Sequence, residues 1–233
     1  MHMIGEVNNH VALMFLLMIT VALAAGIYTR YAAAKRRGEL LAWAQSKGLS
    51  FSPAKQFSLG DRFGSFHCLQ TGQDRYAYNI IQGPWPPERQ AICFDYLYVT
   101  GSGKNRTTHT FSAAVMTSKV PLKPLLIRPE NLFDKFAEFL GFEDIDFESA
   151  EFSRAFYVKS SDRRWAYDVL HPRAMEFLLA RPRFAIQFDT GCAIAFRSTV
   201  FSTRDFQSAC DTLSGLLDGL PEYLVRQQTG GQT

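Results

Sequence analysis

An uninterrupted apolar run near the N-terminus limits this chain more than any other feature of its sequence. Residues 11–28 read VALMFLLMITVALAAGIY and contain no charged side chain. At about 1.5 Å of rise per residue, a helix of this length just crosses a hydrocarbon core of about 30 Å. Buried helices of soluble proteins are seldom apolar on every side over such a length. We therefore expect a short segment at 1–10 and a transmembrane helix at 11–29, with the lipid bilayer as its partner.

The charges beside this run differ on its two sides. Glu6 precedes it without any Lys or Arg, whereas Arg30, Lys35, Arg36 and Arg37 follow it. Positively charged loops stay in the cytoplasm, so the asymmetry predicts a single-pass protein whose C-terminal part is cytoplasmic.

A cleaved signal peptide is the alternative reading of the same residues. Ala22-Leu23-Ala24 resembles an A-x-A cleavage site. Two features favour the anchor instead: the N-terminal region lacks a basic residue, and the apolar run exceeds the 7–15 residues typical of a signal peptide. Cleavage would make the remaining chain an exported domain.

The rest of the chain predicts an α+β domain. Residues 30–48 are expected to form a juxtamembrane helix that stops at Gly48, because a glycine followed by an apolar residue is a common helix end. Residues 49–225 mix helices and strands without a βαβ rhythm, which indicates a mixed antiparallel-sheet and helix domain. No flexible linker divides it, which favours one unit over two subdomains meeting near 145–150. We expect 38–233 to fold without lipid and 226–233 to be a disordered tail.

Periodicity and turn residues predict the individual elements of this domain. The expected strands are 75–82, 91–100, 107–117, 152–159, 184–188 and 192–197. The expected helices are 132–140, 161–170, 172–180 and a long one that a Ser202–Asp205 capping box opens. The prolines in GPWPPE at 83–88 are expected to end the first strand, because proline cannot donate a backbone hydrogen bond.

Three short motifs suggest chemistry that their contexts do not support. The glycines and lysine at 101–104 lack the spacing and the following helix of a phosphate-binding loop. Asp189-Thr190-Gly191 matches the aspartic-protease tripeptide, but those enzymes need two such carboxylates and this turn supplies one. The acidic stretch 143–151 lacks the glycine and spacing of a calcium-binding EF-hand loop. We interpret them as a basic hairpin tip, a hairpin turn and a solvated connection.

The remaining reactive side chains form no recognisable set. The histidines at 67, 109 and 171 and the cysteines at 68, 93, 192 and 210 show no metal-binding or disulfide spacing, so we expect buried free thiols and no cofactor. Asp95 lies among aromatic residues, where it is either a perturbed carboxylate or part of a solvated strand face. A net charge of +3 is too small to indicate nucleic acid.

Three segments resemble a group of uncharacterised bacterial proteins with one membrane span and a C-terminal domain of unknown function. They are TGSGKNRTTH, RPEN and GFEDIDFESAEFSRAFYV, and the likeness covers residues 36–180. The resemblance implies a bacterial source, and with the flanking charges it places the chain in the inner membrane. It implies no reaction, ligand or catalytic residue.

These observations favour a non-enzymatic binding module at the inner face of the membrane. Its partner is either another protein or anionic lipid headgroups, and Lys104 and Arg106 on the basic hairpin tip are the candidate contact residues. The alternative is a membrane-tethered hydrolase with an unrecognised active site, which a deep pocket lined by converging polar groups would favour.

Overall fold

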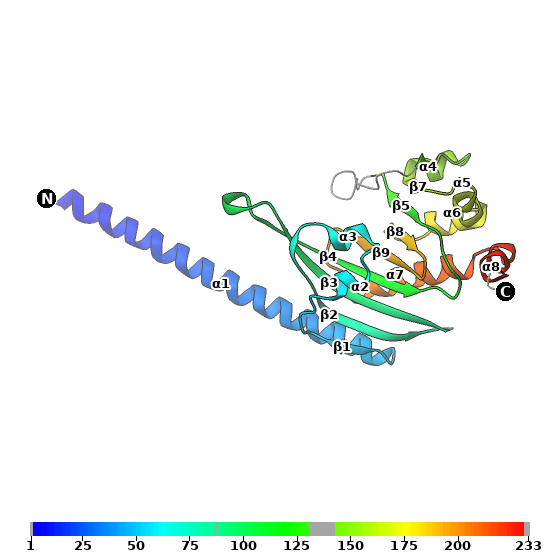
Figure 1. The fold of residues 1–233 in the computed structure, drawn as a ribbon. Helices are drawn as coiled ribbons and strands as arrows, with labels where there is room; N and C mark the ends of the chain where they lie inside the picture. Colours follow the sequence, from blue (N-terminus) through cyan, green and yellow to red (C-terminus); the bar gives the residue numbers. More distant parts are fainter. Residues whose placement is uncertain (1, 87, 131–142, 231–233) are drawn as a thin grey trace.

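A long N-terminal helix leads into an α+β domain (Figure 1). The computed structural model describes residues 2–86, 88–130 and 143–230. The helices are α1 (His2–Ser46), α2 (Leu59–Arg62), α3 (His67–Gln70), the 3₁₀ turn η1 (Gly103–Asn105), α4 (Ala150–Ala155), α5 (Arg163–Val169), α6 (Pro172–Leu179), α7 (Thr203–Asp218) and α8 (Glu222–Thr229). The strands are β1 (Ser50–Ser52), β2 (Gln73–Trp85), β3 (Arg89–Thr100), β4 (Thr107–Thr117), β5 (Leu125–Pro129), β6 (Glu143–Asp144), β7 (Phe156–Ser160), β8 (Ala185–Asp189) and β9 (Cys192–Arg197).

All the strands in the described ranges belong to a single antiparallel sheet. Its order is β1-β2-β3-β4-β9-β8-β5-β7-β6. The pairing of β4 with β9 joins the first half of the chain to the second, so strands from both halves share one sheet. The structure thus has the α+β architecture that the sequence predicts, with one apolar N-terminal helix ahead of the sheet.

The sheet carries a hydrophobic core on each face, because strands β3, β4 and β9 alternate two sets of apolar side chains. The larger core packs against the C-terminal end of α1, the long helix α7 and helices α4–α6. The smaller core holds the aromatic residues of β3 under α2 and α3. On β3, Ile92, Phe94, Tyr96 and Tyr98 face the smaller core, which confirms the alternation expected for this strand.

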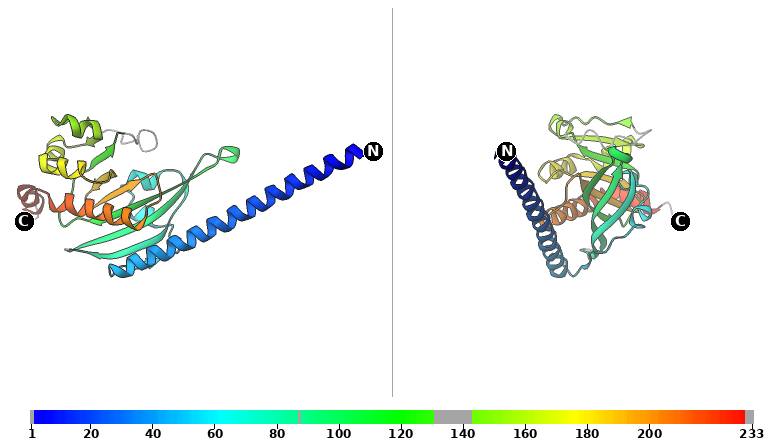
Figure 2. Two further views of the ribbon diagram at one scale, coloured as in Figure 1. Left: turned by 180° about the vertical axis from the view of Figure 1, so that it is seen from behind. Right: turned by 90° about the vertical axis from the view of Figure 1, so that its left-hand side faces the viewer.

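Helix α1 continues without a break from the apolar run into the domain. It is the one helix in the described residues that is long and apolar enough to cross a membrane. Its residues 13–35 are exposed, and it extends away from the domain in Figure 1 and in the left view of Figure 2. It ends as expected: Gly48 has φ +68°, and the amide nitrogens of Gly48 and Leu49 donate to the carbonyl oxygens of Gln45 and Ala44.

Other local predictions also match the structure. Ten residue pairs, from Ala91–Met116 to Thr100–Thr107, form the predicted β3–β4 hairpin. Ser202 and Asp205 form the expected capping box at the start of α7. Pro172 occupies the first turn of α6.

Four predictions need correction or fall outside the described residues. Strand β2 continues to Trp85 despite Pro84, because β1 pairs only as far as Gln82 and leaves the end of β2 at an open sheet edge, where proline is tolerated. Residues 150–155 are helix α4, capped by Ser149, so the predicted strand starts only at Phe156. Residues 226–229, expected in a disordered tail, are helical in α8. The helix predicted at 132–140 and residues 231–233 lie outside the described ranges.

Candidate functional site

The best-defined polar site joins helix α1 to the middle of the sheet. The carboxylate of Asp95 on β3 is completely buried. Arg36 of α1 donates to both of its oxygens, at 2.6 Å and 2.8 Å. The amide of Asn79 donates to it at 2.8 Å and the hydroxyl of Ser112 at 2.5 Å. We call these four residues and the Phe201 backbone, which accepts from Arg36 and donates to Ser112, the junction network.

Local backbone structure brings these side chains together. Strand β2 has one more residue than β3 between the pairs Tyr78–Asp95 and Ile81–Cys93, so it bulges at this point. Asn79 lies in the bulge with φ +50°, a conformation that Asn adopts more readily than most residues. Ser112 lies directly opposite Asp95 on β4. The bulge and the strand register therefore direct an amide and a hydroxyl at the same carboxylate.

The hydrogen bonds of the junction network hold the protein together and leave Asp95 fully occupied. A carboxylate has about four acceptor positions, and the two donors from Arg36 with those from Asn79 and Ser112 occupy four. Asp95 thus has no position left to take a proton from a substrate. Burial raises the pKa of the nearby Tyr78 hydroxyl to about 12, and the Asp95 charge adds to this shift. The Tyr78 hydroxyl therefore stays protonated near neutral pH.

The end of α1 is consequently part of the domain. Leu40 and Ala44 are buried in the larger core, and the ring of Trp43 stacks on Phe206 of α7 with centroids 6.2 Å apart. The fragment 38–233 would lack Arg36 and leave Asp95 without its cation, and its folding without lipid stays a prediction.

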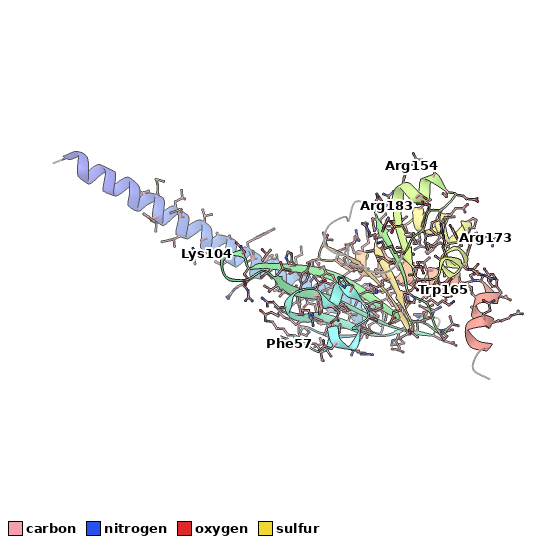
Figure 3. All side chains as sticks on the ribbon, turned by 45° about the horizontal axis from the view of Figure 1, so that its top comes forward. Phe57, Lys104, Arg154, Trp165, Arg173 and Arg183 are labelled. Atoms are coloured by element: carbon pink, nitrogen blue, oxygen red, sulfur yellow. The ribbon has the colours of Figure 1, made fainter. Side chains whose placement is uncertain are left out.

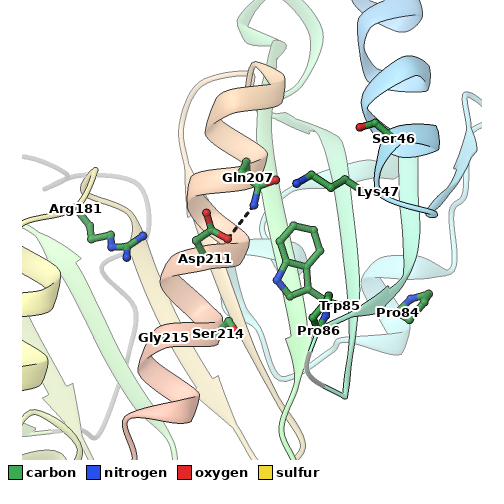
Figure 4. Close-up of a pocket in the computed structure, with 10 residues that line it drawn as sticks. All are labelled: Ser46, Lys47, Pro84, Trp85, Pro86, Arg181, Gln207, Asp211, Ser214 and Gly215. Carbon is green, nitrogen blue, oxygen red and sulfur yellow. Dashed lines mark hydrogen bonds between the residues drawn. The ribbon is translucent and has the colours of Figure 1, made fainter.

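Two cavities lie along α1. The first, about 540 Å³, adjoins the junction network; we call it the junction cavity. It is lined by α1 from Tyr28 to Leu40 and by residues 200–203 before and at the start of α7. The second, about 640 Å³, lies at the C-terminal end of α1. It is lined by the end of α1, Trp85 and α7, with Arg181 on its far side (Figure 4).

The second cavity does not assemble a catalytic group. Its carboxylate, Asp211, accepts a hydrogen bond from Gln207 at 2.9 Å, as Figure 4 shows. Its two serine hydroxyls donate elsewhere, from Ser46 to the Trp43 carbonyl oxygen and from Ser214 to Asp218. Of these two hydroxyls only that of Ser214 has a carboxylate beside it, and this carboxylate, Asp218, is also paired with Arg89 at 2.7 Å.

The basic hairpin tip lies far from the core. Lys104 and Arg106 sit in the exposed connection between β3 and β4, and Figure 3 shows Lys104 at its end. Arg106 forms an exposed ion pair with Asp74 at 2.8 Å. In Figures 1 and 2 the hairpin projects from the domain in the same direction as the N-terminal part of α1.

The other candidate motifs have structural surroundings. Asp189 is the last residue of β8, and Thr190 and Gly191 form the turn to β9. Asp144 of the acidic stretch accepts a hydrogen bond from Tyr157 and pairs with Lys159 at 3.4 Å. No group of three His, Cys, Asp or Glu side chains that could hold a metal occurs in the part of the chain that the structure describes.

The cysteines include one pair that their spacing did not reveal. Cys68, Cys93 and Cys210 are buried and Cys192 is partly buried, all as free thiols. The sulfur atoms of Cys93 and Cys210 lie 3.4 Å apart between β3 and α7. Burial raises the pKa of Cys68, and it raises that of Cys192 to about 11. Thiols in such surroundings are poor nucleophiles at neutral pH.

The junction network was missed by sequence reasoning, although part of it was visible. Asp95 stands in an apolar strand, which marks it as a buried carboxylate that needs a cation. Its cation, Arg36, belongs to the basic run after the candidate membrane span. The positive-inside rule already accounts for basic residues at this place, so the run did not indicate a partner within the domain.

Comparison with known proteins gives one structural likeness. No family model and no curated protein matches this chain. The fold is similar to the crystal structure of the mycobacterial trehalose monomycolate transport factor A, TtfA, with a TM-score of 0.60 and 14% sequence identity. The match covers 78% of this chain and 92% of that one. At this identity the likeness concerns the fold.

Proposed function

We propose that this protein is a non-catalytic accessory factor of lipid handling, anchored by α1 and held against the cytoplasmic membrane surface by contacts with anionic headgroups. One observation carries the proposal: the basic hairpin tip projects in the same direction as the membrane-spanning part of α1 (Figures 1 and 2). Lys104 and Arg106 then approach the surface that α1 enters. The similarity in fold to a lipid transport factor supports the same role.

Electrostatics gives the contact a measurable strength. A basic residue close to an anionic leaflet contributes about 1 kcal/mol, and the attraction decays within a Debye length of about 8 Å at physiological salt. Because Arg106 already pairs with Asp74 at the surface, we expect Lys104 to contribute the larger share. The contact should therefore be weak, additive and sensitive to salt.

Vesicle binding tests this function. The soluble fragment 33–233 retains Arg36 and the part of α1 that packs on the domain. In this fragment, Lys104→Ala with Arg106→Ala should lower partitioning onto phosphatidylglycerol vesicles by about tenfold to thirtyfold, measured by co-sedimentation at low salt. Its melting temperature should change little, because both side chains are exposed.

Arg154→Ala with Arg173→Ala is the matched control. It removes the same charge from α4 and α6, which lie at the end of the domain away from the N-terminus of α1 (Figures 1 and 3). This control should bind vesicles nearly as well as the parent fragment. Equal losses in both variants would mean that net charge alone drives binding, and no loss in the hairpin variant would remove the headgroup contact.

The cytoplasmic location is a separate prediction. Three of the cations after the span, Arg30, Lys35 and Arg37, have no acidic partner in the described residues and predict that the domain stays in the cytoplasm. A phosphatase that is active only outside the cytoplasm, fused after Thr233, should therefore be inactive. A fluorescent protein that folds in the cytoplasm should be bright at the same position. High phosphatase activity would support export through a cleaved signal peptide instead.

A further inference from the structure

The junction cavity lies where α1 leaves the expected membrane. Tyr28 and Tyr31, which line its membrane side, are residues that favour the interface between lipid and water. Val200 and Phe201 form an apolar part of the opposite wall. With about 540 Å³, the cavity is large enough for a small amphiphilic group. A molecule that enters it from the membrane would meet aromatic rings first and charged groups beyond them.

Two opposite charges on α1 line this cavity without a protein partner. Lys35 and Glu39 are four residues apart and so lie on the same side of the helix. Both are exposed, and neither forms an ion pair within the described parts of the chain. The third charged residue, Arg36, is held by Asp95. The cavity therefore offers one cation and one anion, about 6 Å apart along the helix at 1.5 Å per residue.

We propose that the junction cavity binds the headgroup of a zwitterionic phospholipid that carries a primary amine, with its phosphate on Lys35 and its ammonium on Glu39. This proposal rests on the proposed function, to which it adds a second lipid contact at a different place on the protein. The charges decide the class of headgroup. Lys35 balances Glu39 and Arg36 balances Asp95, so the site has no net charge with which to select a purely anionic lipid.

The order of the two charges agrees with this headgroup. Lys35 is the nearer of the two to the membrane, and a helical side chain leans toward the helix N-terminus, which brings its ammonium group back toward the phosphate layer. Glu39 lies one turn further from the membrane, where the amine at the end of the headgroup would reach it. A primary ammonium can donate hydrogen bonds to this carboxylate, whereas a trimethylated amine cannot.

The test uses the full-length protein, purified in detergent and stripped of lipid. Native mass spectrometry measures binding of phosphatidylethanolamine, phosphatidylcholine and phosphatidylglycerol with identical acyl chains. Phosphatidylethanolamine should bind most tightly. Glu39→Gln and Lys35→Gln should each weaken it about tenfold, as expected for the loss of one charge-assisted hydrogen bond. Ala32→Trp, which fills the cavity wall, should weaken all three lipids.

Two controls separate this site from the hairpin contact. Arg37→Gln removes an exposed charge from α1 that does not line the cavity, and it should leave the lipid preference unchanged. Lys104→Ala with Arg106→Ala should also leave it unchanged, even where that variant loses vesicle binding. Equal binding of the three lipids, stronger binding of phosphatidylglycerol, or an unaltered preference in Glu39→Gln would each overturn the site, whatever the vesicle experiment shows.

Discussion

Replacing Arg36 with alanine should lower the free energy of unfolding of the domain by about 3–5 kcal/mol, because it leaves a fully buried carboxylate without its cation. Asp95 is 0% exposed and the side chain of Arg36 is 25% exposed, so solvent screens the pair little. For a folded part of this size, the loss corresponds to a fall in melting temperature of roughly 6–20 °C. Thermal unfolding of the full-length protein in detergent, followed by tryptophan fluorescence, measures it.

The neighbouring arginine provides a matched control. Arg37 is exposed and carries the same charge on the same helix, so Arg37→Ala should change stability by less than about 0.5 kcal/mol. Replacing Arg36 and Asp95 together with leucine should restore part of the stability, because a buried apolar pair needs no compensating charge. If Arg36→Ala melts within about 2 °C of the parent protein, the ion pair contributes under roughly 1 kcal/mol and the junction network does not hold α1.

Replacing Phe206 with alanine should destabilise the domain by a similar amount, about 3–5 kcal/mol, because it opens a cavity in the larger core. This side chain is completely buried on α7. Its ring contacts Phe201 with centroids 5.2 Å apart and stacks on Trp43 of α1. The loss should therefore appear as a lower melting temperature of the whole domain in the same assay.

Phe57 is the matched control for this substitution. Its side chain is 66% exposed and contacts Tyr76, with ring centroids 5.6 Å apart. Phe57→Ala should cost less than about 1 kcal/mol, because little apolar area leaves contact with the protein. Similar losses in the two variants would mean that the contact of α7 with the end of α1 is not the centre of the core.

The predictions that succeeded depend on residues close together in the chain. The stop of α1 at Gly48 needs a glycine with positive φ and one apolar neighbour. The two residues of the capping box, Ser202 and Asp205, are three positions apart, and the alternation along 91–100 of β3 needs only those residues. Such signals can be predicted from the sequence because their energies come from the backbone and adjacent side chains.

The failures arose where a distant segment changed the outcome. Pro84 remains in β2 because β1 is too short to pair beside it, which depends on residues more than thirty positions away. Residues 226–229 are helical in α8, where Leu224 is buried in the core and Arg226 pairs with Glu222. Composition alone suggested a polar, disordered end.

The sequence by itself determined that this chain has one candidate membrane span, an α+β domain after it and a basic hairpin tip, because each follows from hydrophobic length, local periodicity or turn chemistry. Only the tertiary structure decided that the domain begins within the juxtamembrane helix. Arg36 and Asp95 are 59 residues apart in the chain, and their charges suggest no pairing until the β2 bulge and the packing of α1 on the sheet bring them within 2.6 Å. Long-range packing therefore decides which of several similar cations pairs with Asp95.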